Sequence, residues 1–352
     1  MRIVTVVGNR PQFVKAAAVS RLLREAHEEL LVHTGQHYDD ELSRVFFDEL
    51  GVPAPDRELA CGGGSAAEQT ARMLAALDPV IGGLQPDLVL VYGDTNSTLA
   101  GALAAAQAHI PLGHVEAGMR SFDRSMPEEL NRVLTDHAAD LLLCSTETAM
   151  ANLEREGLRE RAHLVGDVMA DVSLAFRDIA AERSTVLAER GLEPGGYLVV
   201  TAHRAGNVDD PERLRLLVEL LEALPGPVAF PLHPRTRARL EAAALLDRVN
   251  AMPPVGYLDF LELVRNARAV LTDSGGVQKE AYLLAVPCVT MRDTTEWVET
   301  IEAGWNVLVD LDKDAALAAL ERVPPAERPE LYGGGHAAER VRDVVSAYTQ
   351  AP

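Results

Sequence analysis

Short apolar runs alternate with amphipathic helical patterns along the whole of this 352-residue chain. Parallel strands are buried on both faces and need a crossover between them, so this alternation predicts parallel sheets covered by helices on both sides. The predicted fold class is therefore α/β, with doubly wound sheets. The predicted strands are residues 3–7, 30–33, 88–92, 112–115, 141–144, 197–201, 228–231, 269–272, 287–291 and 307–309. The predicted helices between them include residues 66–77, 98–108, 212–224 and 315–322.

The length of the chain and the repetition of this pattern predict two domains. A chain of 352 residues exceeds the usual size of one domain, and its strands fall into two series that repeat in kind but not in sequence. We expect a first domain at residues 1–168, a second at 169–336, and a last helix within 337–352 that packs back on the first domain. Ligands of doubly wound sheets bind outside the carboxyl ends of the strands, so the residues that follow each strand are the candidates for a site.

Charge and cysteine content exclude several classes of function. Thirty-three basic and fifty-three acidic residues give a net charge of −20, which would repel a nucleic-acid duplex or an anionic membrane. Any anionic small ligand must therefore be held by a local cluster of cations. The cysteines Cys61, Cys144 and Cys288 have no metal-binding spacing, and no leader or apolar run of about 18 residues occurs. We therefore expect a cytoplasmic protein with neither a membrane nor a nucleic-acid partner.

The turn after the predicted strand at 269–272 has the composition of a phosphate-binding loop. Asp273 is followed by Ser274, Gly275 and Gly276, where a helix begins. Backbone N–H groups at a helix start lack partners and lie at the positive end of the helix dipole, so they suit a phosphate. Ser274 can donate its hydroxyl to that phosphate, or it can be an ordinary helix cap with glycines easing the turn. Glu280, about two helical turns further on, is an acceptor placed to meet sugar hydroxyls.

Cations follow several of the other strands. After the first strand, Arg10 and Lys15 lie at the start of the next helix. Cations at a helix N-terminus interact unfavourably with the helix dipole, so helix stability does not explain their presence. Phosphate binding is therefore the favoured interpretation. In the second half of the chain, His203 and Arg204 follow one strand and Arg292 follows another.

Three carboxylates belong to the first half. Asp94 follows the strand at 88–92, Glu116 follows the strand at 112–115, and Glu128 opens a helix soon afterwards. Asp94 could instead cap a helix, and Glu128 could be present because the helix dipole favours an acid in the first turn. If the second half holds a nucleotide diphosphate, these acids would meet its sugar, which fits acid–base chemistry on a nucleotide sugar.

Other nucleotide and metal chemistries lack their motifs. The chain contains no GxxxxGK(S/T) sequence and no GxGxxG after the first strand, which argues against nucleoside triphosphate hydrolysis and a tightly held NAD. His33 and His37 are four residues apart, but a strand end separates them, so no metal site is expected.

Several segments, each weak alone, occur together in a specific order. They are Gly8-Asn9-Arg10-Pro11 with Lys15, Thr34-Gly35-Gln36-His37, Tyr92-Gly93-Asp94-Thr95, His114-Val115-Glu116-Ala117-Gly118-Met119-Arg120, Pro127-Glu128-Glu129-Leu130-Asn131-Arg132, His203-Arg204, Asp273 to Glu280, and Met291 to Glu296. With them the chain resembles the non-hydrolysing UDP-N-acetylglucosamine 2-epimerases over nearly its whole length.

This resemblance implies a GT-B fold, in which two Rossmann-like domains face each other across a cleft, and usually a homodimer. It also implies inversion of carbon 2 of a UDP-sugar without NAD or metal. The implied mechanism is anti-elimination of UDP to a glycal, followed by re-addition of UDP and protonation from the other face.

The resemblance also implies roles for individual residues. Asp94, Glu116 and Glu128 match the family's catalytic acids, and His203 matches its catalytic histidine. Arg10, Lys15 and Ser274 match residues that contact the diphosphate, and Glu280 matches the residue that contacts the ribose. Substrate contacts are also implied for four further residues of the matching motifs: Arg204, Gly275, Gly276 and Arg292. Which carboxylate removes the proton and which returns it stays open.

The chain also departs from the family pattern. Tyr38-Asp39-Asp40 replaces a basic segment that is frequent in bacterial members, so we expect no allosteric activation by UDP-N-acetylglucosamine. The sugar therefore stays open between UDP-N-acetylglucosamine and a modified UDP-HexNAc such as UDP-2,3-diacetamido-glucuronic acid. A GT-B glycosyltransferase is the alternative of another class; it would need an acceptor groove and no obligatory set of carboxylates.

Overall fold

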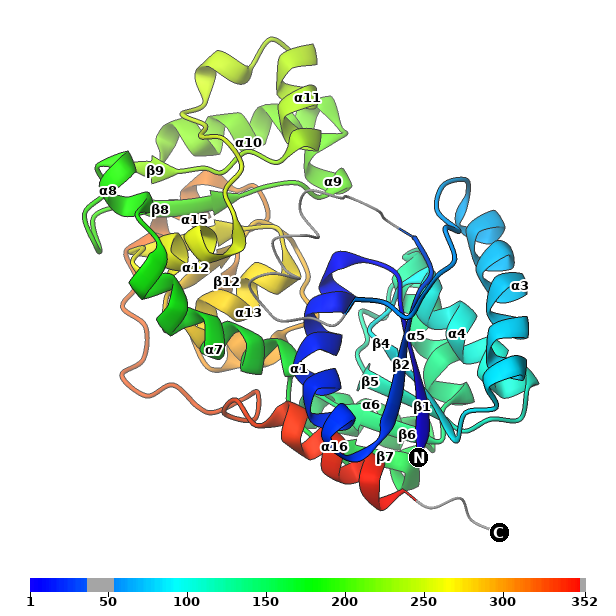
Figure 1. Cartoon of the computed structure of the whole chain (residues 1–352). Helices are drawn as coiled ribbons and strands as arrows, with labels where there is room; N and C mark the ends of the chain where they lie inside the picture. Colours follow the sequence, from blue (N-terminus) through cyan, green and yellow to red (C-terminus); the bar gives the residue numbers. More distant parts are fainter. Residues whose placement is uncertain (37–53, 349–352) are drawn as a thin grey trace. The chain divides into compact units, whose positions relative to one another are not determined.

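The computed structural model describes residues 1–36 and 54–348, and for Arg10 the backbone alone. The chain forms two compact units (Figure 1). Unit 1 comprises Met1–Val172 and Leu331–Pro352, and unit 2 comprises Ser173–Glu330. The departures predicted at Tyr38-Asp39-Asp40, like His37, lie outside the described residues.

Unit 1 is built on a parallel sheet. Within its described residues the sheet has seven strands in the order β3-β2-β1-β4-β5-β6-β7. In chain order the elements are β1 (Arg2–Val7), α1 (Arg10–Ala26), β2 (Glu28–His33), β3 (Arg57–Glu58), α3 (Ala66–Leu84), β4 (Leu88–Tyr92), α4 (Asn96–Gln107), β5 (Leu112–Ala117), α5 (Pro127–Ala138), β6 (Leu141–Cys144), α6 (Glu147–Arg155), a 3₁₀ turn (Arg159–Arg161), β7 (Ala162–Leu164) and, after unit 2, α16 (Ala337–Ala347).

The strands of unit 1 bury both faces, as their continuous apolar runs predicted. On β1, Val4 and Val6 belong to the apolar layer formed with α3 and α4, whereas Ile3 and Val7 belong to the layer formed with α1 and α16. Figure 1 shows α1 and α16 on one side of this sheet and α3 and α4 on the other. The doubly wound arrangement predicted for this half of the chain is confirmed.

The last helix is tied to unit 1 at its start. The Asp171 carboxylate accepts hydrogen bonds from the backbone N–H groups of Ala337 (3.0 Å) and Ala338 (2.7 Å), which satisfies the first donors of α16. Val341 and Val345 on the same helix are fully buried against α1.

Unit 2 repeats the design with a smaller sheet. Its described residues form five strands in the order β12-β11-β10-β8-β9, all parallel. Helix α7 (Val168–Arg183) leads into it, and the elements that follow are α8 (Val186–Arg190), β8 (Leu198–Thr201), α9 (Ala205–Val208), α10 (Pro211–Ala223), β9 (Val228–Ala229), α11 (Pro234–Ala242), a 3₁₀ turn (Leu246–Arg248), α12 (Tyr257–Arg265), β10 (Ala269–Thr272), α13 (Gly275–Leu283), β11 (Cys288–Thr290), α14 (Val298–Glu302), β12 (Asn306–Leu308) and α15 (Lys313–Leu320).

The largest difference between a predicted and an observed element is the position at which α3 ends. The pattern predicts a helix that ends at Leu77, but α3 continues through Pro79 to Leu84. Proline removes one backbone donor and crowds the preceding turn. Pro79 lies on the exposed face, and the buried Ile81 continues the apolar stripe of Met73 and Leu77, so packing carries the helix past the proline.

Each sheet has one point at which the strand order reverses. In unit 1 the chain runs outward from β1 to β2 and β3, then returns to place β4 on the other side of β1. In unit 2 it runs from β8 to β9, then places β10 on the other side of β8. Ligands of doubly wound sheets bind at such switch points, at the carboxyl ends of the strands. The turns after β1 and β4, and those after β8 and β10, are therefore where each unit is expected to carry a site.

Among residues 1–36 and 54–348, no helix is long and apolar enough to cross a membrane.

Candidate functional site

The turns after β1 and β4 are joined by one buried glutamine. The side-chain amide of Gln12 accepts a hydrogen bond from the Gly8 N–H (2.8 Å) and donates to the Tyr92 carbonyl (2.6 Å). It also donates to Thr98, in the first turn of α4 (2.8 Å). This bridge fixes the start of α1 against the end of β4. It therefore positions Lys15 relative to the turn that carries Asp94.

Lys15 and Glu116 form an ion pair at this switch point. The Lys15 ammonium contacts Glu116 Oε2, and both side chains are nearly buried, at 13% and 12% exposure. Glu116 has a left-handed backbone with φ 73°, and the β5–β6 register shifts at this residue, between Val115 and Ala117. A bulge of this kind re-aims a side chain, and left-handed backbone at a residue other than glycine is strained.

Gly93 lies directly beside this ion pair. A Cβ atom placed on Gly93 would be 3.4 Å from Lys15 Nζ and 3.5 Å from Glu116 Oε2. Its backbone is also left-handed, with φ 62°, a conformation that glycine adopts freely. The next residue is Asp94, so two of the predicted acids and one predicted cation meet around one glycine.

Asp94 is held by an arginine of α5. Arg132 donates to Asp94 Oδ2 through both Nε (3.0 Å) and Nη2 (2.6 Å). The same guanidinium donates to Glu129 (3.2 Å). Glu129 in turn accepts from the backbone N–H groups of Ser121 (2.8 Å) and Phe122 (3.1 Å). Helix α5 therefore anchors both the Asp94 carboxylate and the loop that precedes the helix.

Glu128 lies in the first turn of α5 and is exposed. Within the described part of the chain its carboxylate makes no hydrogen bond or ion pair. The dipole of α5 favours an acid at this position, which is the alternative that the sequence left open for this residue. Its side chain is exposed, whereas that of Asp94 is 33% exposed and that of Glu116 is 12% exposed.

In unit 2, the turn after β10 leaves the start of α13 uncapped. Ser274 is the N-cap residue, but its hydroxyl makes no capping hydrogen bond, and the first turn of α13 contains no acid. The Ser274 N–H donates instead to the Thr272 hydroxyl (2.9 Å). Gly276 is exposed, and a Cβ on Gly275 would be 3.2 Å from the Trp297 indole nitrogen. The capping alternative for Ser274 is wrong, and the turn keeps the donors that a phosphate needs.

The turn after β8 is fastened to the turn after β10 by a buried acid. The fully buried Asp273 accepts hydrogen bonds from the backbone N–H groups of His203 (3.1 Å) and Arg204 (2.9 Å). The Asn207 side chain donates to the same carboxylate (3.2 Å). Asp273 Oδ1 also lies 3.7 Å from Nδ1 of His203. His203, Arg204 and the Ser274 turn are thereby brought together.

His203 is favoured in its neutral form. Burial lowers the pKa of His203, and this effect outweighs the opposing influence of Asp273. The His203 ring stacks on His233 with centroids 5.2 Å apart. Burial lowers the pKa of His233 as well, and the neighbouring His203 adds to that shift. A neutral imidazole of this kind is ready to gain a proton when an anion arrives.

Arg292 and Glu280 occupy the remaining edge of this half-site. Arg292 donates to both carboxylate oxygens of Glu296 (3.0 and 3.1 Å). Burial opposes ionisation of Glu296, but Arg292 outweighs it, and the pKa of Glu296 falls. The side chain of Glu280 on α13 is 8% exposed. Arg292 is thus engaged by an acid of its own loop.

Each unit therefore carries half of the predicted set. Lys15, Asp94 and Glu116 gather in unit 1, and His203, Arg204 and Ser274 gather in unit 2, where Gly275 and Gly276 continue the turn. The Arg10 side chain lies outside what the structure describes. The sequence did not predict the partners that hold these residues, namely Gln12, His114, Arg132, Asp136, Asn207 and Asp273. A usable signal for two of them existed, because Arg132 and Asp136 follow Glu128 at intervals of four on one face of α5.

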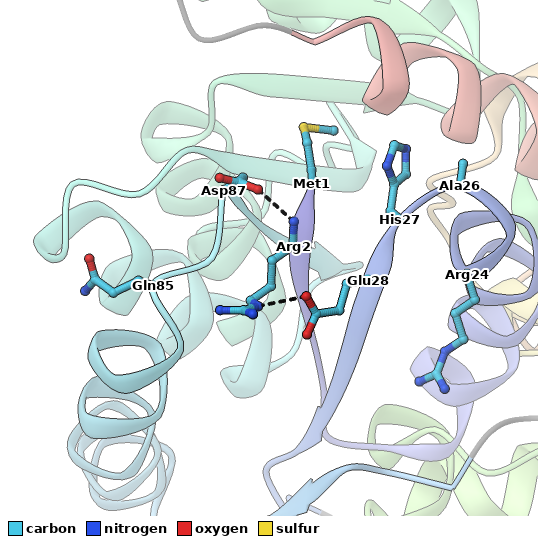
Figure 2. A pocket seen from close by; sticks show the side chains of 8 residues that line it. All are labelled: Met1, Arg2, Arg24, Ala26, His27, Glu28, Gln85 and Asp87. Atoms are coloured by element: carbon cyan, nitrogen blue, oxygen red, sulfur yellow. Dashed lines mark hydrogen bonds and ion pairs between the residues drawn. The ribbon is translucent and has the colours of Figure 1, made fainter.

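A surface pocket lies at the opposite edge of the unit 1 sheet. It is lined by the amino ends of β1 and β2, including Arg2, His27 and Glu28 (Figure 2). Arg2 pairs there with Glu28 (3.1 Å), and the Arg2 N–H donates to Asp87 (2.7 Å). These groups satisfy one another, and none of the predicted site residues lines this pocket.

Among the described residues, no group of three or more His, Cys, Asp or Glu side chains is arranged to hold a metal ion.

Comparison with known proteins gives full-length matches. The family model described as UDP-N-acetylglucosamine 2-epimerase matches residues 21–346. A UDP-N-acetylglucosamine 2-epimerase homolog of Methanococcus maripaludis is 47% identical, covering 98% of this chain and 99% of its own. The UDP-2,3-diacetamido-2,3-dideoxy-D-glucuronate 2-epimerase of Pseudomonas aeruginosa is also 47% identical, with the same coverage. The crystal structure of Methanocaldococcus jannaschii UDP-GlcNAc 2-epimerase in complex with UDP-GlcNAc and UDP superposes with a TM-score of 0.89 at 41% identity, covering 98% of this chain and 99% of that one.

Proposed function

Because the chain belongs to the UDP-N-acetylglucosamine 2-epimerase family and is an isomerase, we propose that it inverts carbon 2 of a UDP-linked 2-acetamido sugar. The first candidate substrate is UDP-N-acetylglucosamine. The observation that carries the proposal is the gathering of Asp94, Glu116 and Lys15 around Gly93 at the switch point of unit 1. Acids held this firmly at the end of a central strand suit proton transfer.

The nucleotide is assigned to the switch point of unit 2. Phosphate oxygens would accept from the N–H groups of Gly275 and Gly276 and from the Ser274 hydroxyl, with His203 and Arg204 alongside. Support comes from the uncapped start of α13 and from the acid-free first turn. Glu280 would accept from a ribose hydroxyl. For Arg10 and Lys15 we propose the diphosphate contacts that the family resemblance implies.

The chemical step is assigned to the carboxylates of unit 1. The hydrogen at C2 has no adjacent carbonyl to acidify it, so its removal must be coupled to loss of the diphosphate. One carboxylate takes the C2 proton, the C1–C2 double bond forms, and the bond from C1 to the UDP oxygen breaks. UDP then adds back to C1, while C2 takes a proton on its opposite face. Cations around the departing diphosphate stabilise its developing charge. The sequence of steps is redox neutral, so the proposal requires neither NAD nor a metal.

The roles of Asp94, Glu116 and Glu128 follow from this scheme. Base and acid must act on opposite faces of the sugar ring, so at least two separate carboxylates are needed. Asp94 and Glu116 are anchored by Arg132 and Lys15, respectively, whereas Glu128 is solvated. Asp94 and Glu116 are therefore the two carboxylates with fixed positions. We assign the two proton transfers to carboxylates among Asp94, Glu116 and Glu128.

A second candidate sugar is UDP-2,3-diacetamido-glucuronic acid. It is supported by the 47% identity to the Pseudomonas aeruginosa enzyme that carries this name, which equals the identity to the Methanococcus maripaludis UDP-N-acetylglucosamine 2-epimerase homolog. The two sugars differ by a carboxylate at C5 and a second acetamido group at C3, so direct assay separates them.

The test is incubation of purified protein with UDP-GlcNAc, UDP-ManNAc and the UDP-diacetamido-uronate, followed by proton NMR of the sugar. We expect the C1 and C2 signals of one sugar pair to approach the same equilibrium from either side. Failure to epimerise any of the three, by protein that binds UDP in calorimetry, would overturn the proposal.

We also propose a cytoplasmic homodimer. Support for a reducing compartment is that Cys61, Cys144 and Cys288 are all free and buried. The homodimer is what the family resemblance implies. Light scattering after size-exclusion chromatography should give about twice the chain mass of 38.0 kDa, and a single-chain mass would contradict it.

A further inference from the structure

His114 is buried on β5 between two hydrogen-bond acceptors. Its side chain is fully buried. Nδ1 lies 2.6 Å from Asp136 Oδ1, and Nε2 lies 2.7 Å from the carbonyl oxygen of Gly93. A backbone carbonyl accepts only, and an ionised carboxylate accepts only. A neutral imidazole has one N–H, so one of these two short contacts would then set a nitrogen lone pair against an oxygen lone pair.

Asp136 is held as an anion by its other neighbours. Its second oxygen accepts from Arg120 Nη1 (2.7 Å) and from the Gly118 N–H (3.0 Å). The proton between Asp136 and His114 therefore belongs to the imidazole.

The charges around His114 favour a cationic ring. Arg120 forms a double hydrogen bond with Glu156 of α6, at 2.8 and 2.7 Å, as well as its bond to Asp136. The nearby Cys144 thiol is neutral because burial raises its pKa. Glu156 is 26% exposed and partly solvated, whereas the Asp136 side chain is fully buried. With His114 neutral, the buried Asp136 would share the single cation Arg120 with Glu156, which is costly for a buried charge.

The second N–H of His114 reaches the reaction site. Gly93 donates its own N–H to the Val115 carbonyl (3.0 Å), so both polar groups of its peptide units are tied to β5. Gly93 borders the Lys15–Glu116 pair, and Asp94 is the next residue. The Gly93 carbonyl belongs to the peptide that joins Gly93 to Asp94, so anchoring it holds the backbone of Asp94 in place relative to Glu116 on β5.

We infer that His114 is held as an imidazolium by Asp136 and acts as a positioning residue, its Nε2–H anchoring the Gly93 carbonyl so that Asp94 stays in register with the Lys15–Glu116 pair. The role in catalysis rests on the proposed epimerase function. The charge state does not rest on it, so the two parts are tested separately.

The charge state is tested by proton–nitrogen NMR of the histidine rings in the wild-type protein at pH 7.5. His114→Phe identifies the signals by their loss. We expect both ring nitrogens of His114 to carry protons that exchange slowly with water. A single ring proton, or a ring nitrogen with the chemical shift of an unprotonated imidazole, would overturn the inference whether or not the protein epimerises any sugar.

The positioning role is tested by comparing two variants that differ in what remains at Gly93. His114→Phe keeps the size of the ring but removes the bond to Gly93, and we expect kcat to fall by about 100-fold, as positioning errors do. Asp136→Asn lets a neutral His114 accept from the amide and still donate to Gly93, so it should retain at least tenfold more activity than His114→Phe. UDP affinity in calorimetry should stay within about twofold in both, because neither change removes a group that is proposed to contact the diphosphate.

His163→Phe, on β7 of the same sheet, is the matched control and should leave kcat unchanged. Folded His114→Phe protein, judged by circular dichroism, with kcat within about threefold of wild type would overturn the positioning role, as would equal activity of the two variants. If His114→Phe does not fold, the test compares kcat of Asp136→Asn with that of the wild type and records the ring signals of His114 in both proteins. A loss of activity above 100-fold while the bond from His114 to Gly93 remains would contradict the positioning role. Absence of epimerase activity in the wild type would count against the proposed function alone.

Discussion

Replacing Arg132 with methionine removes the group that holds Asp94, and the structure gives the size of the effect. The Arg132 side chain is 9% exposed, and its partners Glu129 and Asp94 are 4% and 33% exposed. Removing one member of a buried ion pair costs about 3–5 kcal/mol because a charge is left uncompensated. Asp94 is partly solvated and Glu129 keeps its bonds to Ser121 and Phe122, so we expect a loss somewhat below that range, about 2–3 kcal/mol in the free energy of unfolding.

The same change should lower activity more than it lowers UDP binding. Without Arg132 the Asp94 carboxylate has no fixed direction, and kcat should fall by about tenfold to 100-fold, while UDP affinity changes by less than about threefold. Arg132→Lys keeps the charge but loses the two-pronged contact, so its kcat should lie between those of methionine and wild type.

Unfolding in urea should be followed by far-UV circular dichroism. Trp297 and Trp305 are both in unit 2, so tryptophan fluorescence would not report on unit 1. Arg215→Met is the matched control, because its pairs with Glu212 and Glu219 are exposed and should contribute little to stability. If Arg132→Met unfolds with the same free energy as this control and turns over at the wild-type rate, the reasoning about the Asp94 clamp is refuted.

Three further predictions concern the assigned roles. Arg10→Ala and Ser274→Ala should each weaken UDP binding by about 2 kcal/mol, the worth of one charge-assisted hydrogen bond, and unchanged affinity in calorimetric titration would remove them from the site. UDP binding near pH 7.5 should be accompanied by uptake of a proton, because burial lowers the pKa of His203 in the free protein and an adjacent diphosphate would raise that pKa. Calorimetry in buffers of different ionisation enthalpy measures the proton uptake, and release of a proton would contradict the prediction. Asp94→Asn and Glu116→Gln should abolish turnover, a loss of at least about 10²–10⁴, with UDP affinity within about tenfold, so near-normal rates would make these acids structural.

The fold class and the family were predictable from local patterns. Continuous apolar runs specify strands buried on both faces, and the rule that ligands bind at the carboxyl ends of parallel strands predicts a site at the turns that carry Asp94 and Ser274. The family model and the Methanocaldococcus structure confirm the resemblance and the GT-B type of fold. Several strand ends differ from the predicted ones by one or two residues, and the short β3 and β7 were not predicted because two or three residues carry no periodicity.

The partners of the site residues were not predictable in the same way. Arg132 meets Asp94 across 38 positions of sequence, and His114 meets Asp136 across 22. Which cation takes which carboxylate depends on how α5 docks against β4 and β5, and this follows from tertiary packing rather than from the spacing of residues in one segment. The left-handed backbone of Glu116 is likewise invisible in sequence, because nothing in the residue type demands it. The domain bounds, the site roles and the homodimer remain predictions.

The exchange of the hydrogen at C2 tests the central claim most directly. If one carboxylate of unit 1 removes this proton and another returns a proton to the opposite face, the abstracted proton is lost to solvent during turnover. Turnover in D₂O followed by proton NMR should therefore show deuterium at C2 of the product from the first turnovers, and prolonged incubation should release some UDP together with the glycal. Retention of the original hydrogen at C2 through complete epimerisation would contradict the elimination mechanism and the assignment of Asp94, Glu116 and Glu128.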